Sequence, residues 1–380
     1  MTAHLHDSGD ILHDRYRIDS YLAEGGMQQV YKATDLSFER PVALKVPKNE
    51  SAEKRFARSA QMSARVNHPN VAKTLDYFEE AGRAYLIEEL IDGVDLSTAF
   101  KERFIYLDPH LAAHLVHHLA KGVAASHHAE VYHRDLKPSN IMVSNDPNLS
   151  EVRITDFGIA KLAEEEIAQN IHDDTSIIAS QTLVGALPYM APEVIEDHKK
   201  ASKPADVWAL GAMLHFFIAG EPPYGFGLAA VPKILTALPP GPPSFFANAK
   251  QFRPLTEELW AVVTKCLSKA PNSRPTANEL IKMCSVLCYS SAPRKSGVIE
   301  SFKNSSGSWG TITGDDGEAV FFHADSSYSK VRLRRGQRVD FACFPGTPRP
   351  RAFSRASNQR DLTVAALSAT LTKSKKCPQA

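Results

Sequence analysis

No stretch of the 380-residue sequence is apolar for long enough to cross a bilayer, and the N-terminus lacks the apolar core of a signal peptide. We therefore expect a cytoplasmic protein with no membrane segment. Cysteine is also scarce: the five residues are an odd number and lack the spacing of metal ligands, which argues against a disulfide framework. With 43% hydrophobic and 23% charged residues, the composition is otherwise ordinary for a globular protein.

Net charge is almost absent, at +1, but the two signs are unevenly distributed. Residues 294–380 hold 15 Lys and Arg against 7 Asp and Glu, a net charge of +8, which leaves −7 for residues 1–293. A length of 380 residues allows two domains, or one large domain and one small. A basic piece behind an acidic body indicates an anionic partner for that piece, although a solvated basic tail has the same composition.

The residues that carry chemistry are concentrated in two short motifs. The sequence HRDLKPSN ends at Asn140, and the sequence DFG begins at Asp156, sixteen residues later. Phosphoryl transfer to a hydroxyl needs a carboxylate near the hydroxyl proton, here Asp135, and oxygen ligands that hold Mg²⁺ against the nucleotide phosphates, here Asn140 and Asp156. The motifs resemble the catalytic loop and metal-binding turn of the eukaryotic-type (Hanks-type) Ser/Thr protein kinases. The resemblance implies ATP and Mg²⁺ as cofactors and Lys137 as the residue that stabilises the transferred phosphoryl group.

The same resemblance continues near the N-terminus. The segment LAEGGMQQVYKA, residues 22–33, is similar to the glycine-rich nucleotide loop of the kinases, but Ala23 and Gln28 replace two of its three glycines. Lys45 follows on an apolar strand, where a charge is costly unless it is paired, and the resemblance implies that it binds the ATP phosphates. The residues that would contact ATP on this basis are Leu22, Gly25, Val30, Ala43, Lys45, Glu88, Glu89 and Ile91.

The helix that supplies the usual partner of this lysine departs from the family pattern. It is expected over residues 52–66 and has Ser59 where kinases have a glutamate. Glu88 stands on a normally apolar position at the back of the adenine pocket, and a buried carboxylate needs a cation. We therefore expect Glu88 either to pair with Lys45 in place of the missing glutamate or, if the strand register differs by one residue, to point outward.

Residues 159–182 match the activation segment of the family, and Arg134 would receive a phosphate placed there. The hydroxyl groups that would accept this phosphate are those of Thr175, Ser176, Ser180 and Thr182. Ala186 stands where the family has a threonine that contacts the catalytic loop. Further on, Glu193 and Arg274 are expected to form the family's buried ion pair.

The helix expected at residues 109–129 carries four histidines on adjacent turns. His114 and His118, at positions i and i+4, have the spacing of two zinc ligands. No third ligand is apparent, so we favour a partly buried helix over a metal site.

After a short linker, the pattern changes to short strands separated by Gly, Asp and Ser turns. The expected strands are residues 297–302, 307–312, 319–323 and 331–341. Their alternation resembles a cold-shock domain, a five-stranded OB-type barrel that stacks single-stranded nucleic acid on aromatic side chains. The nucleic-acid-binding residues implied are Phe302, Trp309, Phe321 and His323. Ser301, Thr311 and Ala324 replace other aromatics of that family, so the alternative is a barrel whose aromatic residues only form its core.

These resemblances predict an α+β architecture, a bilobal protein-kinase fold followed by a small five-stranded OB-type β-barrel. The expected units are a flexible arm at 1–14, a kinase domain at 15–289 (small lobe 15–91, large lobe 92–289), a linker at 290–295, a cold-shock-like domain at 296–356 and a basic tail at 357–380. We expect a Ser/Thr protein kinase that acts on an unidentified protein, with single-stranded RNA or DNA as the partner of the barrel. The alternative, favoured by Gln28, Ser59 and Ala186, is a pseudokinase that binds nucleotide or nucleic acid without catalysis.

Overall fold

The computed structural model describes residues 4–25, 28–48, 56–57, 60–157, 185–238, 241–243, 253–302, 308–327, 332–344 and 350–356. Ser59, the four activation-segment hydroxyls and the basic tail lie outside these ranges. Within them, no helix is long and apolar enough to span a membrane.

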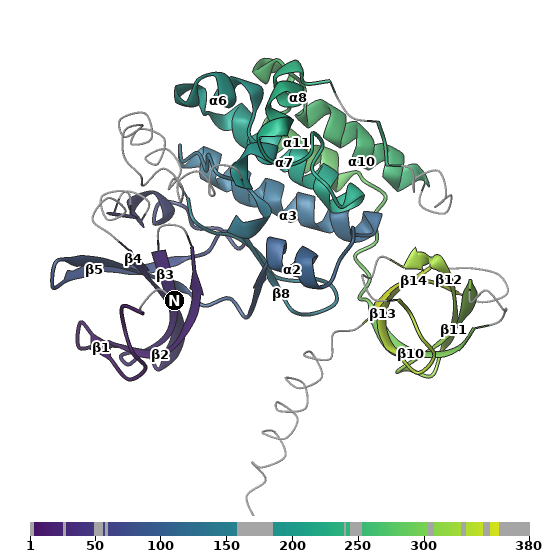
Figure 1. The fold of residues 1–380 in the computed structure, drawn as a ribbon, viewed down its shortest axis with the longest axis horizontal. Coiled ribbons are helices and arrows are strands. Elements are labelled where there is room, and N and C mark those ends of the chain that lie inside the picture. Colours follow the sequence, from purple (N-terminus) through teal and green to yellow (C-terminus); the bar gives the residue numbers. More distant parts are fainter. Residues whose placement is uncertain are drawn as a thin grey trace, which may run out of the picture.

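A six-stranded antiparallel sheet, with the order β1-β2-β3-β4-β6-β5, forms the small lobe (Figure 1). Its strands are β1 (Ile11–Leu12), β2 (Tyr16–Glu24), β3 (Gln28–Asp35), β4 (Arg40–Pro47), β5 (Thr74–Glu80) and β6 (Arg83–Glu89). Alternate side chains of a strand point to opposite faces of the sheet. On one face, Tyr31, Leu44 and Ile87 are fully buried in an apolar core. The other face carries both apolar and charged residues, among them Val30, Ala43 and Lys45.

Residues 4–14, expected as a flexible arm, instead pack on this sheet. His4 stacks on Tyr21 with ring centroids 4.2 Å apart, and the Leu5 N–H donates to the Tyr31 hydroxyl at 3.0 Å. Leu12 is buried in the same apolar core. The polar composition of the arm does not reveal these contacts, because they are made with strands distant in the sequence.

The large lobe is mainly helical. Its helices are α2 (Leu96–Glu102), α3 (Pro109–His128), α6 (Pro192–Glu196), α7 (Lys203–Ala219), α8 (Val231–Thr236), α10 (Arg253–Cys266) and α11 (Ala277–Ser285). α3 begins where the Asp108 carboxylate accepts the backbone N–H groups of His110 and Leu111, with Pro109 at the first helical position. α7 is almost entirely buried and ends at Gly220, whose φ of 78° is left-handed. A Cβ at Gly220 would lie 2.3 Å from the Ile105 carbonyl oxygen, so only glycine fits there.

A small sheet consists of β7 (Gly93–Asp95), β8 (Ile141–Ser144) and β9 (Val152–Ile154). The catalytic loop precedes β8, and the DFG motif follows β9. β8 and β9 are antiparallel, and Ile141 lies opposite Ile154. Because Asn140 precedes β8 and Thr155 follows β9, the pairing continues into the loops, where the Thr155 N–H donates to the Asn140 carbonyl at 2.9 Å. This register brings the ends of the two sequence motifs together.

The C-terminal region closes into a five-stranded barrel, as expected, with the order β10-β11-β12-β14-β13. Its strands are β10 (Lys295–Phe302), β11 (Trp309–Gly314), β12 (Ala319–Ser327), β13 (Arg338–Phe344) and β14 (Arg351–Ala356). Ile299, Ile312, Val320, Phe322 and Phe341 are fully buried inside it. The sequence did not indicate β14, which pairs in parallel with β12 and antiparallel with β13. Both partners are needed to close the barrel: β13 directly precedes β14 in the chain, whereas β12 is separated from β14 by β13.

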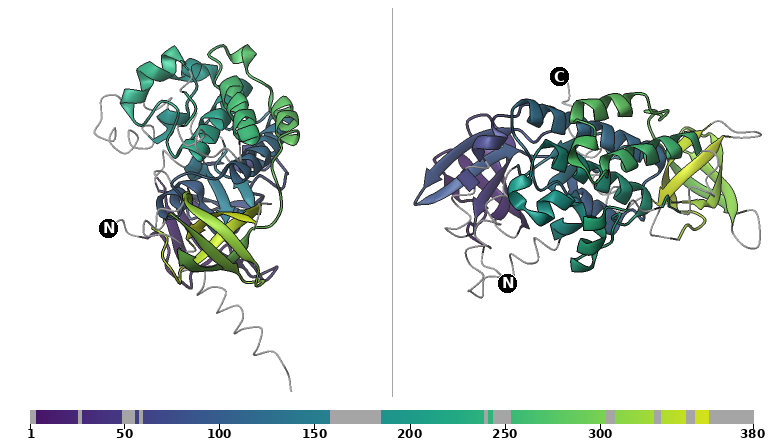
Figure 2. Two further views of the ribbon diagram at one scale, coloured as in Figure 1. Left: turned by 90° about the vertical axis from the view of Figure 1, so that its right-hand side faces the viewer. Right: turned by 90° about the horizontal axis from the view of Figure 1, so that it is seen from above.

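The barrel lies on the opposite side of the helical lobe from the six-stranded sheet (Figures 1 and 2). The linker holds it there: Arg294 forms an ion pair with Asp108, and its N–H donates to Asn148 Oδ1 at 2.8 Å. His110 Nδ1 accepts the Ser290 N–H at 2.8 Å, and its ring lies 4.8 Å from that of Phe344 in β13. The start of α3 is therefore the element to which the barrel is attached.

Candidate active site

One face of the small-lobe sheet carries the residues expected to contact a nucleotide. Val30 lies opposite Lys45, which lies opposite Leu86, and Ala43 lies opposite Glu88. Residues directly opposite one another in a sheet share a face, as do residues two apart in one strand, so all five side chains point to the same side. The strand register therefore turns Glu88 inward, which excludes the outward alternative.

Lys45 is the centre of a buried ionic cluster. Its ammonium lies 2.7 Å from Glu88 Oε2 and 2.9 Å from Asp156 Oδ1, and the exposed fractions of Lys45 and Glu88 are only 6% and 4%. The predicted pairing of Glu88 with Lys45 is thus confirmed. Burial alone would lower the pKa of Lys45, but the Asp156 and Glu88 carboxylates raise it above its usual value, so the ammonium stays charged.

The carboxylates of this cluster respond to it in different ways. Burial tends to raise the pKa of Asp156, but the Lys45 ammonium and the hydrogen bonds from Lys45 and Gln28 hold that pKa below its usual range. The Gln28 bond joins Nε2 to Asp156 Oδ1 at 3.0 Å. Burial raises the pKa of Glu88, although the Lys45 ammonium opposes this. The Lys45 ammonium thus favours the charged form of both carboxylates, and burial outweighs it at Glu88 but not at Asp156.

The catalytic-loop residues converge on one oxygen. Asp135 Oδ2 accepts the Lys137 ammonium at 2.7 Å and the Asn140 Nδ2–H at 3.1 Å, and Asn140 also donates to the Asp135 carbonyl at 2.8 Å. Asn140 sits in a 3₁₀ turn over Pro138–Asn140, which turns its side chain back toward Asp135. A carboxylate held by a cation and an amide is fixed in position but keeps its second oxygen for a hydroxyl proton.

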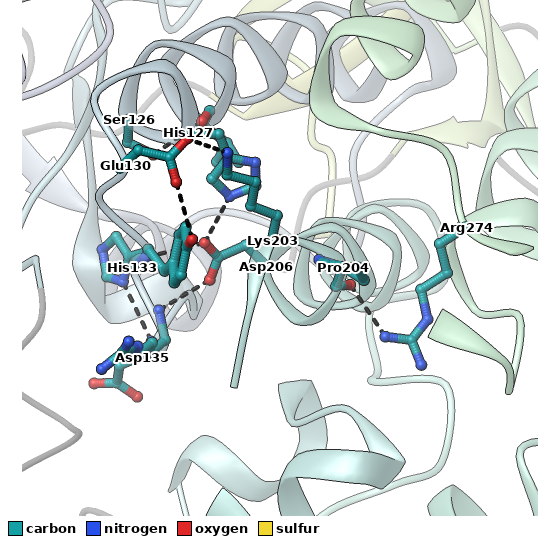
Figure 3. A network of polar contacts seen from close by, with 12 residues as sticks. Ser126, His127, Glu130, His133, Asp135, Lys203, Pro204, Asp206 and Arg274 are labelled. Atoms are coloured by element: carbon teal, nitrogen blue, oxygen red, sulfur yellow. Dashed lines mark hydrogen bonds and ion pairs between the residues drawn. The ribbon is translucent and has the colours of Figure 1, made fainter. Parts of the chain in front are cut away.

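Asp206 of α7 anchors this loop through hydrogen bonds (Figure 3). Its carboxylate accepts the His133 N–H at 3.0 Å, the Arg134 N–H at 2.9 Å and His127 Nε2 of α3 at 2.9 Å. The Arg134 backbone has a left-handed φ of 68°, a conformation that costs a non-glycine residue free energy and needs such anchoring. Burial tends to raise the pKa of Asp206, but the hydrogen bond and charge of His127 lower it overall, so the carboxylate is anionic.

A family model described as a protein kinase domain matches residues 16–284. The chain belongs to the protein kinase family. Members of this family bind ATP with divalent metal ions and act on proteins. The match ends before the barrel begins.

Several curated relatives are Ser/Thr protein kinases. PkaA of Streptomyces coelicolor is 34% identical over 248 residues, which cover 63% of this chain and 42% of that protein. PknB of Mycolicibacterium smegmatis is 32% identical over 284 residues, which cover 71% of this chain and 42% of that protein. The chain thus spans less than half the length of these relatives.

Solved kinase structures share the fold. Rad53 in complex with AMP-PNP superposes with a TM-score of 0.55 at 22% identity, over 71% of this chain and 64% of that chain. The kinase domain of Mycobacterium tuberculosis PknI gives a TM-score of 0.53 at 22% identity, over 74% of this chain and 98% of that chain.

The oxygen atoms of the kinase site are suitable ligands for a hard divalent cation. Within the described part of the chain, no group donates to Asn140 Oδ1 or Asp156 Oδ2, so two oxygen ligands remain for a metal. No cluster of three or more His, Cys, Asp or Glu side chains suited to a metal occurs among these residues. Mg²⁺ typically takes one or two carboxylate or amide oxygens and completes its shell with water and phosphate oxygens. The arrangement therefore matches a metal that arrives with a nucleotide.

The remaining candidates for the nucleotide differ in exposure and orientation. Ala43 is buried, Val30 and Ile91 are half-buried, and Leu22 is 47% exposed at the edge. Gly25 donates its N–H to the Gln28 carbonyl at 2.9 Å, which closes the turn between β2 and β3. Glu89 points away, toward the Arg153 guanidinium at 3.2 Å.

The large-lobe expectations are met where the structure describes them. Arg274 binds Glu193 through two bonds of 2.6 and 2.8 Å, and its guanidinium is buried, so the predicted ion pair is confirmed. Ala186 is buried without a hydroxyl to offer the catalytic loop. His114 and His118 are both half-buried, with ring centroids 4.4 Å apart.

The barrel brings together three of the four expected aromatic residues. Trp309 lies opposite His323. Phe321 is two residues before His323 in the same strand, so all three side chains share the outer face. The Trp309 and Phe321 rings are 5.5 Å apart. Phe302 does not join them: it pairs with Gly310 on the inner face and meets the core ring of Phe322 at 5.4 Å. The prediction that Phe302 binds nucleic acid is therefore wrong. A register shift between Ile299 and Ser301, which the sequence does not reveal, turns Phe302 inward.

Two polar residues of the kinase site were not recognised from the sequence as parts of it. His127 reads as an ordinary residue near the end of a helix, and Gln28 as a missing glycine. Their partners Asp206 and Asp156 are 79 and 128 residues away, so no local pattern indicates the contacts.

Proposed function

We propose that the chain is an ATP- and Mg²⁺-dependent kinase that transfers the γ-phosphoryl group to serine or threonine hydroxyls of a protein in the cytoplasm. The observation that carries this proposal is the convergence of Lys137 and Asn140 on Asp135 Oδ2, beside the buried cluster of Lys45 and Asp156. Phosphoryl transfer depends mainly on positioning and on stabilisation of charge, and this arrangement supplies both.

In this proposal, each residue has a separate task. Asp135 accepts or orients the proton of the substrate hydroxyl, and Lys137 compensates the charge on the phosphoryl group in transfer. Asn140 and Asp156 would hold the metal, which would neutralise the nucleotide phosphates. Lys45 binds those phosphates while Glu88 keeps its ammonium in place. Leu22, Val30 and Ala43 would enclose the adenine, whose edge would pair with the backbone of residues 89–91.

Catalysis is favoured over a pseudokinase because the groups for metal, phosphate and acceptor proton are retained, and because Glu88 supplies the carboxylate that Ser59 cannot. The test is incubation of the purified chain and a protein acceptor with radiolabelled ATP. Asp135→Asn should lower the rate by about a hundredfold or more, as expected for loss of a positioned general base. Asp10→Asn, which changes an exposed carboxylate of the small lobe, is the matched control. If the Asp135→Asn chain labels the acceptor as well as the native chain does, the label comes from a contaminating kinase, and the pseudokinase alternative stands.

We propose a second function for the barrel, binding of single-stranded RNA or DNA, and retain residues 296–356 as a cold-shock-like domain. The outer face with Trp309, Phe321 and His323 supports this proposal. Arg332, Arg334 and Arg335 are exposed on the loop that follows, and this loop bonds to β10 through Gly336 N–H and the Ile299 carbonyl at 2.8 Å. β10 is the neighbour of β11, so cations flank the aromatic face.

Fluorescence anisotropy of a labelled oligonucleotide titrated with the full chain tests this function. Each stacked base contributes about 1–3 kcal/mol, so Trp309→Ala should weaken binding by about fivefold or more. Added salt should weaken it further, because phosphate contacts release counterions. Phe226→Ala, which removes an exposed aromatic ring of the kinase lobe, is the control. No binding at low salt would leave the barrel as a protein-interaction module.

A further inference from the structure

Gln28 is the first residue of β3 and stands where the kinase family has the third glycine of its nucleotide loop. Val30, two residues later, lies opposite Lys45, so the register turns Gln28 toward the cleft as well. Its side chain is 9% exposed. The neighbouring Gln29 points to the other face, where it accepts the Tyr31 hydroxyl at 2.5 Å and the Leu5 N–H at 3.0 Å.

The Gln28 amide reaches across the cleft to the large lobe. Its Nε2 lies 3.0 Å from Asp156 Oδ1, and the same oxygen accepts the Lys45 ammonium at 2.9 Å. An oxygen with two lone pairs is then fully used by two donors. The contact joins the nucleotide turn directly to the carboxylate that the proposed function assigns to the metal.

The charges of the cluster explain why an amide fits there. Among the residues that the structure describes, Glu88 and Asp156 form ion pairs with one ammonium, that of Lys45, so this buried cluster has more carboxylates than cations. The N–H end of the Gln28 amide compensates part of the excess negative charge. A divalent cation at Asp156 would supply that compensation itself and would repel the N–H end of the amide.

Space leads to the same conclusion as charge. A glycine at this position lets phosphates approach the backbone closely, whereas the Gln28 side chain extends through the space between the turn and Asp156. Phosphates and their metal cannot occupy that space while the amide bridges it.

We propose that Gln28 is an additional determinant of nucleotide binding in this kinase: its amide occupies Asp156 Oδ1 and the space between the nucleotide turn and Asp156, and it must turn away before the magnesium–nucleotide binds. This inference rests on the proposed use of ATP and Mg²⁺. It predicts that the chain needs more nucleotide for half-saturation than it would with the family's glycine.

Equilibrium binding to the full chain tests the competition. A fluorescent ATP analogue is titrated with Mg²⁺ and, separately, with EDTA, for the native chain, Gln28→Ala and Gln28→Gly. A hydrogen bond to a charged group that no longer has to be broken should tighten Mg²⁺-dependent binding by about tenfold, which corresponds to about 1.4 kcal/mol. The half-saturating Mg²⁺ concentration should fall as well, and binding in EDTA should change less.

Gln29→Ala is the matched control, because it removes the same side chain from the next position on the opposite face. It should leave the affinity for the magnesium–nucleotide unchanged. Gln28→Ala separates loss of the amide from the extra backbone freedom of Gln28→Gly, and thermal unfolding shows that both variants are folded. Unchanged or weaker Mg²⁺-dependent binding by both Gln28 variants would overturn the inference.

The binding readout is independent of catalysis. If the native chain transfers label but the Gln28 variants bind like it, the inference fails and the proposed kinase function stands. If the variants bind more tightly but no chain transfers label, the competition is supported and the proposed catalysis fails. If no chain binds the analogue, both fail.

Discussion

At the scale of the residue, the site is defined by which carboxylate each cation meets. Lys45 is bound by Glu88 from its own sheet and by Asp156 from the other lobe. A lysine buried to this degree stays charged only because both acids are near. Glu88 therefore has a task in stability as well as in the proposed nucleotide binding.

Removal of Glu88 tests this task. Glu88→Met should lower the free energy of unfolding by about 3 kcal/mol, the lower end of the cost of breaking a buried pair, because Lys45 keeps Asp156 as a partner. Urea unfolding measures the loss. Glu89→Met is the control: its carboxylate forms a half-exposed pair with Arg153 that should be worth less than about 1 kcal/mol. A Glu88→Met chain as stable as the native one would contradict the pairing.

At the scale of the element, α3 links several parts of the molecule. Its first residues meet the linker through Asp108 and His110, and its last turn supports the catalytic loop through His127 and Asp206. Between these ends it carries His114, His117 and His118. Burial lowers the pKa of each of these three histidines and of His110.

These histidines predict acid sensitivity between about pH 6.5 and 4. Burial, helped by the charges of His114 and Lys121, lowers the pKa of His118 to about 4. In that window the unfolded chain binds protons that the folded chain does not, so the free energy of unfolding falls as the pH falls. Glu88, whose pKa is raised, opposes this effect, whereas Asp156 and Asp206, whose pKa values are lowered, lose their contribution only at more acidic pH.

The measurement is the melting temperature at pH 7 and pH 5. The native chain should lose stability on acidification, and His118→Gln should lose less of it because one proton-binding group is gone. An equal loss in both chains would show that His118 does not contribute.

At the scale of the whole molecule, the barrel is attached to the large lobe and lies on the opposite side of it from the six-stranded sheet (Figure 2). The Arg294–Asp108 pair at this junction is 5% and 0% exposed. α3 is therefore in contact with both the junction of the barrel and the support of the catalytic loop.

Asp108→Asn should loosen this attachment. An asparagine still caps α3, but it cannot pair with Arg294, and breaking a buried ion pair costs about 3–5 kcal/mol. Limited proteolysis should then cut the linker at residues 290–294 faster than in the native chain. Asp95→Asn, which changes the N-cap of α2 without touching the linker, is the control and should leave the cleavage rate unchanged.

Much of this molecule follows from local patterns. The motifs around Asp135 and Asp156 predicted the kinase fold. They also predicted that the catalytic loop and the DFG turn meet, because only one antiparallel strand pair, β8 and β9, separates the two motifs. The alternation of the C-terminal segment predicted a small barrel. It did not predict β14, whose parallel partner β12 is distant in the sequence, or the inward position of Phe302, which depends on a register shift.

The family and the catalytic loop could be recognised from the sequence, since they depend on residue types at fixed spacings, and the resemblance to that family implied the Glu193–Arg274 pair. Only the tertiary structure decided that Glu88 points at Lys45, that Gln28 crosses to Asp156 and that His127 supports the loop through Asp206. Each of these contacts joins elements from different parts of the chain. Their geometry is set by strand register and helix packing, which no local pattern of side chains specifies.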